Sequence, residues 1–307
     1  MKKILIVLGG TSKERKVSLD SGRACVRAIK TLGYKYEIFD PAKSDLIDLK
    51  KHKPDIIFNS LHGKDGEDGN IQSYFEYFKI PYTHSGVISS MNCMDKIISK
   101  NIFIKNKLST PRYFYIHKTN YNKKLLKKIL KSKKINCPIV IKPSNEGSSI
   151  GVKICKKNSD LIKFSDQLFK SYNTLIYEKF IGGQEIQVAV MMGKAIGAIE
   201  LRPKRKFYDY KAKYLKSSKT THVMPAGISK KKYLEVLKLA ERAHKVLKCR
   251  GVSRCDFKFQ NKKFYLLEIN TQPGMTNLSL VPEIAKYFGI TFNGLIKKII
   301  QDASVNR

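Results

Sequence analysis

The chain has 307 residues, 42% of them apolar, so it can bury a sizeable core and is long enough for two or three lobes. It carries 60 Lys and Arg residues against 25 Asp and Glu, which gives a formal net charge of +35. The apolar content excludes a largely disordered chain, and no apolar run approaches the roughly 20 residues that a membrane-spanning helix requires.

The first predicted element is a strand at residues 4–8, an apolar run that two glycines and a polar stretch follow. The run is shorter than the roughly 7–15 apolar residues of a secretory leader. We therefore expect a buried strand that leads into a glycine turn, in a protein that stays in the cytoplasm.

Apolar runs alternate with helical patterns as far as about residue 90, at residues 17–32, 36–39, 56–59 and 71–78. This alternation indicates parallel strands joined by crossover helices. Ligands usually bind at the loops that follow the carboxyl ends of such strands. Two glycine-containing loops, residues 9–18 and 61–70, are expected to lie there.

The densest lysine run, residues 123–134, places Leu125, Leu126, Ile129 and Leu130 at helical spacing, which indicates an amphipathic helix with a solvated basic face. Nucleic acid is the alternative explanation of the charge. We do not favour it, because lysines occur along the whole chain and no zinc finger or stacking motif accompanies them. A compositional bias toward Lys, Ile and Asn explains the charge, which would also favour an anionic nucleotide as substrate.

Beyond Pro111 the pattern becomes α+β with antiparallel pairing. It predicts helices from about Asp160 and at residues 230–247, and strands at residues 139–142, 152–155, 175–178, 185–192, 255–259 and 264–270. Lys142 ends the first of these strands, and the loop NEGSSIG at residues 145–151 follows it. A lysine beside a loop of small residues suits a phosphate site under a mobile cover, although glycine-serine loops are common.

The last two strands form a predicted hairpin that can bring polar groups together. Residues i and i+2 of a strand share a face, so Glu268 and Asn270 can converge with Asp256, and Arg254 lies beside Asp256. Three hard oxygen donors suit magnesium, but a polar face whose charges merely pair is an equally good interpretation. The turn TQPGMT at residues 271–276 either presents N–H groups to an oxyanion or is an ordinary turn.

Several other kinds of site are not supported. The chain has no GxxxxGK[ST] and no GxGxxG, so neither a P-loop nor a dinucleotide fold is indicated, and the loop at residues 65–70 does not have EF-hand spacing. Its cysteines are scattered without a CxxC pair, which favours buried thiols in a reducing compartment over disulfides or zinc ligands. They are Cys25, Cys93, Cys137, Cys155, Cys249 and Cys255.

Nine segments, taken in order, resemble the D-alanine:D-alanine ligase family of the ATP-grasp superfamily. They are GGTSKERKVSLDSG, LHGKDGEDGNIQ, PYTHSG, MDK, VIKPSNEGSSIGV, FYDYKAKY, HVMPAG, SRCDF and LEINTQPGMTNLSLVP. The resemblance implies a parallel α/β, Rossmann-like domain at residues 1–95, followed by an ATP-grasp fold of two α+β lobes at residues 96–181 and 182–307. It also implies ATP-dependent joining of two D-alanine molecules through D-alanyl phosphate, for peptidoglycan precursors, by a homodimer.

The resemblance also implies the site residues. The implied catalytic and first-substrate residues are Glu14, His62, Ser148, Tyr214, Arg254 and Gly274, of which Arg254 and the Gly274 amide would stabilise the oxyanion. Those implied for ATP are Lys96, Lys142, Ser149, Glu178, Lys179, Ile181, Glu185 and Lys213. Asp256, Glu268 and Asn270 would bind two Mg²⁺ or Mn²⁺ ions, and Ser279 and Leu280 would receive the second D-alanine.

Two questions stay open at this stage. The group that deprotonates the second D-alanine is either His62 or the network of Ser148 and Tyr214. The tyrosine of the loop at residues 207–214 favours a dipeptide over the D-lactate product of some relatives, whereas D-serine stays an alternative second substrate.

Overall fold

A parallel three-stranded sheet forms the N-terminal part of the chain in the computed structural model, which describes residues 2–203, 220–276 and 278–307. The strands β1 (Lys3–Val7), β2 (Lys35–Phe39) and β3 (Ile56–Asn59) lie in the order β2-β1-β3. Ile4 and Ile6 of β1 join one apolar cluster, and Leu5 and Val7 join another. Both faces of β1 are therefore buried, which explains its uninterrupted apolar run.

Helices and short 3-10 turns connect and cover these strands, as the alternating pattern predicted. They are α1 (Arg15–Thr31), η1 (Leu46–His52), α2 (Asn70–Tyr77) and α3 (Val87–Met94). The loops at residues 9–18 and 61–70 follow β1 and β3, as expected, and they lie on the same edge of the sheet because both strands run in the same direction.

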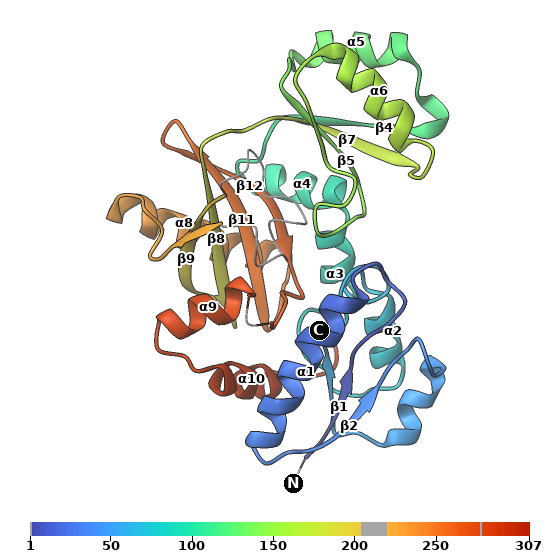
Figure 1. Ribbon diagram of the computed structural model, residues 1–307, viewed down its shortest axis with the longest axis vertical. Helices are drawn as coiled ribbons and strands as arrows, with labels where there is room; N and C mark the ends of the chain where they lie inside the picture. The colour runs from blue at the N-terminus through green and yellow to red at the C-terminus, as the bar shows by residue number, and fades with distance from the viewer. Residues whose placement is uncertain (1, 204–219, 277) are drawn as a thin grey trace.

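A four-stranded antiparallel sheet forms the central part, drawn at the top of Figure 1. Its order is β4-β7-β5-β6, with β4 (Tyr113–His117), β5 (Ile139–Pro143), β6 (Lys153–Cys155) and β7 (Thr174–Lys179). Three helical segments accompany it, η2 (Lys118–Asn120), α5 (Lys123–Lys133) and α6 (Asn158–Leu168). Leu126 of α5 is buried in the core of this part while the lysines of the helix stay outside it, so the predicted amphipathic helix is confirmed.

A five-stranded sheet forms the C-terminal part, in the order β10-β9-β8-β11-β12. The strands are β8 (Gln184–Met191), β9 (Lys194–Arg202), β10 (Thr221–Val223), β11 (Val252–Gln260) and β12 (Lys263–Asn270). Alternate residues of β8 point to opposite faces. Val188 and Val190 pack with α8 (Lys230–Val246), whereas Ala189 belongs to the cluster that contains α9 (Leu280–Tyr287) and α10 (Phe292–Gln301). Helices therefore cover both faces of the sheet.

The apolar clusters show which parts share a core. One cluster joins β1, α1, β8, β9, α9 and α10, so the N-terminal and C-terminal sheets pack through a common interior. The helix α4 (Lys96–Lys105) also contacts β12 and α8. The cluster of the central part contains only residues between Phe114 and Tyr177. The central sheet therefore has an interior of its own.

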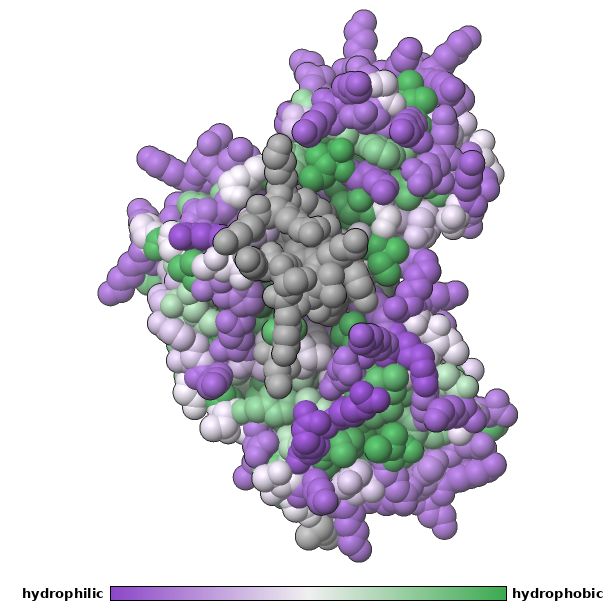
Figure 2. Space-filling view, viewed as in Figure 1, coloured by the Kyte–Doolittle hydropathy of each residue, from purple (hydrophilic) through white to green (hydrophobic). Residues whose placement is uncertain are grey.

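The surface agrees with charge that is spread along the chain. Hydrophilic side chains are spread over the upper, left and lower right parts of the face shown in Figure 2, with a group of hydrophobic side chains among them at the lower centre. No helix within the described ranges is long and apolar enough to cross a membrane. All six cysteines are free thiols, and Cys93 and Cys249 lie with their sulfur atoms 3.7 Å apart.

Candidate active site

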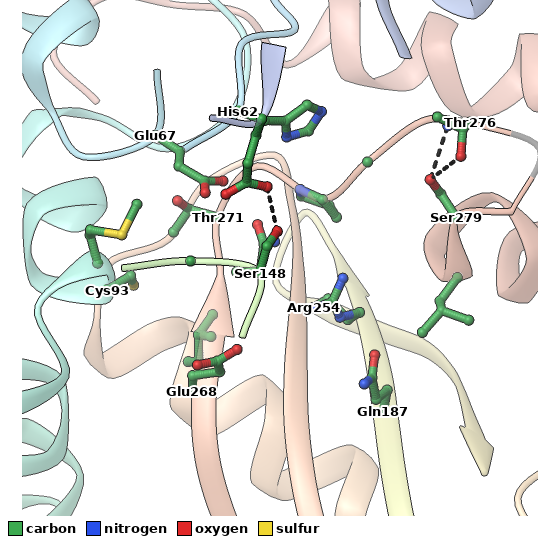
Figure 3. A pocket seen from close by; sticks show the side chains of 18 of the residues that line it. His62, Glu67, Cys93, Ser148, Gln187, Arg254, Glu268, Thr271, Thr276 and Ser279 are labelled. Atoms are coloured by element: carbon green, nitrogen blue, oxygen red, sulfur yellow. Dashed lines mark hydrogen bonds between the residues drawn. The ribbon is translucent and has the colours of Figure 1, made fainter. Parts of the chain in front are cut away.

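A pocket lies where the N-terminal loops, the loop after β5 and the end of the β11–β12 hairpin meet (Figure 3). Segments from all three parts of the chain line it, so only the folded arrangement brings them together. Every described residue that sequence reasoning assigned to the amino-acid substrates and the oxyanion lines this pocket: Glu14, His62, Ser148, Arg254, Gly274, Ser279 and Leu280. Glu268 and Asn270 line it as well.

The loop at residues 145–151 is docked onto the first N-terminal loop. The Ser148 hydroxyl donates a hydrogen bond to the Glu14 carboxylate, 134 positions away in the sequence. Ser148 and Ser149 both have positive φ, 48° and 60°, a conformation that few non-glycine residues adopt. A Cβ atom on Gly147 would lie 3.0 Å from Glu14 Oε1, so a residue without a side chain allows the close approach.

Glu67 is a second buried carboxyl in this pocket, which sequence reasoning did not single out. Its Oε1 accepts a hydrogen bond from the Gly63 N–H at 3.1 Å. Burial, and then the negative charge of Glu14, raise the pKa of Glu67 well above its usual value. The only signal in the sequence was the acidic, glycine-rich loop around it, and that pattern does not tell which carboxylate turns inward.

His62 is buried between α1 and the turn at residues 271–276. Its Nε2 lies 3.2 Å from Ser21 Oγ, and the same hydroxyl accepts a hydrogen bond from the Met275 N–H at 3.1 Å. Burial lowers the pKa of His62 to about 4, and the positive charge of Arg254 acts in the same direction. The imidazole is therefore neutral near pH 7 and is a weak base.

The β11–β12 hairpin has the register that the i, i+2 argument required. Asp256 is opposite Glu268, and Arg254 is opposite Asn270. The Arg254 Nε and Nη2 atoms lie 2.8 and 2.9 Å from the two oxygens of Asp256, and Lys96 Nζ lies 3.9 Å from Glu268 Oε2. Charge pairing on a polar face, one of the two interpretations of this hairpin, is thus present.

The same hairpin also has the chemistry of a site for a hard cation. No three His, Cys, Asp or Glu residues are clustered for a metal ion within the described ranges. The hairpin instead offers two carboxylates and one amide oxygen, that of Asn270, which accepts a hydrogen bond from the Gln272 N–H at 2.8 Å. Oxygen donors of these kinds are the ones that Mg²⁺ prefers, so the set fits the ion.

A second pocket lies between the central and C-terminal sheets, beside the first. It is lined by the described residues that were predicted to bind ATP, namely Lys96, Lys142, Ser149, Glu178, Lys179, Ile181 and Glu185, with Asp256 and Glu268. Apolar side chains complete the wall, among them Val140, Ile150, Val152, Phe180 and Leu267. Lys96 and Glu268 line both pockets, so the two cavities adjoin at these residues.

Charged side chains of both signs line the second pocket, with Lys258 and Glu146 in addition to those already named. Lys96 begins α4, whose N-cap Asp95 accepts hydrogen bonds from the backbone of the first turn. The Glu178 carboxylate faces Lys142 Nζ at 3.0 Å, and Glu185 pairs with Lys258 at 3.0 Å. The end of the pocket that adjoins the first one therefore presents one ammonium group, of Lys96, and one carboxylate, of Glu268.

Two predicted residues, Lys213 and Tyr214, lie outside the described residues. Residues 279–280 are placed by the start of α9. The Ser279 hydroxyl accepts a hydrogen bond from the Thr276 N–H at 2.9 Å, which closes the turn that follows β12 (Figure 3). Gln272 ties the same turn to the end of β3 through the Asn59 carbonyl at 2.5 Å.

Comparison with known proteins agrees with this arrangement. The family model of the D-ala D-ala ligase C-terminus matches residues 102–301, and that of the N-terminus matches residues 35–85. The chain is 55% identical to a D-alanine–D-alanine ligase of Pelagibacter ubique over 100% of this chain and 99% of the relative. It is 42% identical to that of Rickettsia felis, over 99% of this chain and 92% of the relative.

Solved structures of the Bacillus anthracis D-alanine–D-alanine ligase are also similar. One matches with a TM-score of 0.88 at 32% identity, and another, complexed with ATP, with a TM-score of 0.85 at 30% identity. Each covers 98% of this chain and 97% of the solved chain. The fold is the parallel α/β and α+β architecture expected of an ATP-grasp enzyme. The chain belongs to the D-alanine–D-alanine ligase family.

Proposed function

We propose that this chain uses ATP to join two D-alanine molecules into D-alanyl-D-alanine, releasing ADP and phosphate, as a step toward peptidoglycan precursors. The main support for the proposal is that the two pockets adjoin, because Lys96 and Glu268 line both of them. An amino acid in the first pocket would have its carboxylate close to the terminal phosphate of a nucleotide in the second. A carboxylate is a poor electrophile until a phosphoryl group converts one oxygen into a leaving group.

The first pocket would hold the first D-alanine. Glu14 is buried and lies beside the Ser148 hydroxyl, so its carboxylate is suited to receive the substrate ammonium group. Tyr214 would join this network. In the second pocket Lys96, Lys142 and Lys213 would bind phosphates under the Ser149 loop. The segment Glu178, Lys179 and Ile181 would read adenine, and Glu185 would bind the ribose.

Asp256, Glu268 and Asn270 would hold magnesium or manganese, two ions in all. Bound there, divalent cations would offset the charge of the nucleotide phosphates. The protein groups position the reactants beside this site. Lys96 spans the two pockets, so its ammonium can contact phosphate oxygens while the carboxylate of the first D-alanine approaches.

In the second step the amine of the second D-alanine attacks the acyl phosphate, and phosphate leaves. Ser279 and Leu280 at the start of α9 would receive its carboxylate, and Arg254 with the Gly274 N–H would stabilise the oxyanion. The low pKa of His62, about 4 because of burial, makes it a poor acceptor for the ammonium proton. We therefore assign the proton transfer to the Ser148 and Tyr214 network.

The larger organisation follows the same proposal. Each of the ranges 1–95, 96–181 and 182–307 contains one sheet, and we propose these ranges as the domains. Exposed apolar side chains on the neighbouring helices α2 and α3, Tyr77, Ile88 and Met91, support a homodimer, which sedimentation would test. The free thiols and the need for ATP support a cytoplasmic location.

The decisive experiment measures phosphate release from ATP with D-alanine and L-alanine in parallel, with and without Mg²⁺. We expect turnover only when D-alanine and Mg²⁺ are both present, and chromatography should identify the dipeptide. Equal turnover with L-alanine would overturn the proposal. D-lactate and D-serine, added as competing second substrates at several pH values, should yield little product.

A further inference from the structure

Lys100 is a fully buried lysine that lines neither pocket. It lies on α4 one turn after Lys96, with a side chain that is 0% exposed. Its Nζ lies 2.9 Å from Glu178 Oε1 and donates a hydrogen bond to Thr110 Oγ1 at 2.7 Å. The ammonium also lies 5.6 Å from the centre of the Tyr113 ring. A buried charge with this many partners is held in one place.

The Glu178 oxygen that Lys100 contacts is shared with a pocket residue. Lys142 Nζ lies 3.0 Å from the same Oε1 atom. Two ammonium groups are therefore ion-paired with one carboxylate oxygen. Glu178 is 3% exposed, so little water reaches its carboxylate to compensate for the loss of a partner. Lys142 has two possible partners, this carboxylate and a nucleotide phosphate.

We propose that Lys100 is a positioning residue for nucleotide binding, which keeps Glu178 neutralised when Lys142 turns from that carboxylate to a phosphate. The inference rests on the proposed role of Lys142 at the phosphates. Without Lys100, the same exchange would leave a buried carboxylate with no cation in contact with it, a costly state in a protein interior. Lys100 therefore acts through Glu178 and Lys142 and does not touch the substrate.

The charges around Glu178 agree with this role. Burial raises the pKa of Glu178, but Lys100 and then Lys142 outweigh burial, and the net shift is downward. Burial lowers the pKa of Lys100 to about 8, although the attraction of Glu178 opposes that change. Each of these two charges therefore stabilises the other. The ion pair of Lys100 and Glu178 can persist in both states of Lys142.

The test compares Lys100→Met with Lys105→Met, a matched change at an exposed position of the same helix. We expect Lys100→Met to raise the KM for ATP and the Kd for ADP with Mg²⁺ at least tenfold, while both D-alanine KM values stay within twofold. Lys105→Met should change none of them. Thermal unfolding of the ligand-free proteins shows whether the variants fold. If Lys100→Met does not fold, Lys100→Gln is measured in its place.

A second arm separates positioning from a purely structural role. In a Glu178→Gln background no carboxylate needs a counter-charge, so Lys100→Met should change the ADP Kd less than twofold there. An ADP Kd within twofold of the parent for Lys100→Met, or an equal loss in both backgrounds, would overturn the inference. Lys142→Met distinguishes the two proposals. If it leaves ADP binding unchanged, the phosphate role of Lys142 is wrong; if it weakens binding and Lys100→Met does not, only the present inference fails.

Discussion

A methyl group added at Gly274 would enter the part of the first pocket proposed for the second D-alanine. A Cβ atom there would lie 2.8 Å from Ser279 Oγ, which is closer than side chains normally approach. Gly274 does not have a positive φ, so alanine fits the backbone and the fold should be kept. The hydroxyl of Ser279 must therefore move. Gly274→Ala thus perturbs one hydroxyl without straining the chain.

The size of the effect follows from the bonds of that hydroxyl. Ser279 Oγ makes two contacts of 2.9 Å, with the Thr276 N–H and with Thr276 Oγ1. A hydrogen bond of this kind contributes about 0.5–1.5 kcal/mol. Losing one or both costs about 0.5–3 kcal/mol, and we expect the displaced hydroxyl to weaken binding of the second D-alanine by up to that amount, roughly a 2-fold to 150-fold rise in its KM.

Initial rates of phosphate release over a wide range of D-alanine concentration give a separate KM for each D-alanine. We expect Gly274→Ala to raise the KM of the second D-alanine and to leave the KM for ATP unchanged, with the unfolding temperature lowered only by the loss of these one or two hydrogen bonds. Gly294→Ala, which adds the same methyl group on α10 away from both pockets, is the control. An unchanged second KM in Gly274→Ala would refute the placement of that substrate.

Three further outcomes are expected. Glu268→Gln should lower turnover roughly 100-fold or more at saturating Mg²⁺ without a change in unfolding temperature, and full activity would contradict the proposed metal ligand. The low pKa of His62, about 4, keeps the imidazole neutral between pH 5 and 8. If kcat/KM falls on the acid side of this range, His62→Gln should therefore not move the midpoint of that fall. Disappearance of the fall in the variant would show that His62 is the titrating group. Asp40→Asn should lower the free energy of unfolding at pH 7 by about 1–2 kcal/mol, measured by urea titration. Burial raises the pKa of Asp40, but Arg15 and two backbone N–H groups outweigh burial and lower the pKa to about 2. The difference in free energy of unfolding between variant and parent should therefore shrink as the pH falls from 4 toward 2. A difference that stays constant would contradict the pairing of Asp40 with Arg15.

Local periodicity was enough to predict the elements that carry most of the site. The hairpin is the clearest case, because the i, i+2 rule predicted the shared face of Glu268 and Asn270 and the register places Asp256 opposite Glu268. The amphipathic pattern of α5 and the alternation around β1 also hold. These features depend on residues that are close in the sequence, so the spacing of polar and apolar residues is enough to predict them.

Features that depend on distant neighbours were not visible. The strand β9 was not predicted. A Cβ atom on its Gly197 would lie 2.1 Å from the Phe288 ring, so the residue at this position is set by packing against a segment about 90 residues away. The inward turn of Glu67 and the pairing of Lys100 with Glu178 are of the same kind. The sequence does not distinguish a buried lysine from an exposed one, and in a chain with so many lysines the composition gives no indication of which are buried.

The separate interior of the central sheet has a mechanical consequence. Because its apolar cluster ends at its own strands and helices, this part can tilt as a rigid body without opening a cavity in the interior shared by the other two sheets. The hydrogen bond from Ser148 to Glu14 then joins the central part to the N-terminal part in the closed position. A nucleotide between the central and C-terminal sheets and an amino acid beside Ser148 and Glu14 would each favour the closed position, and the two binding events would reinforce one another.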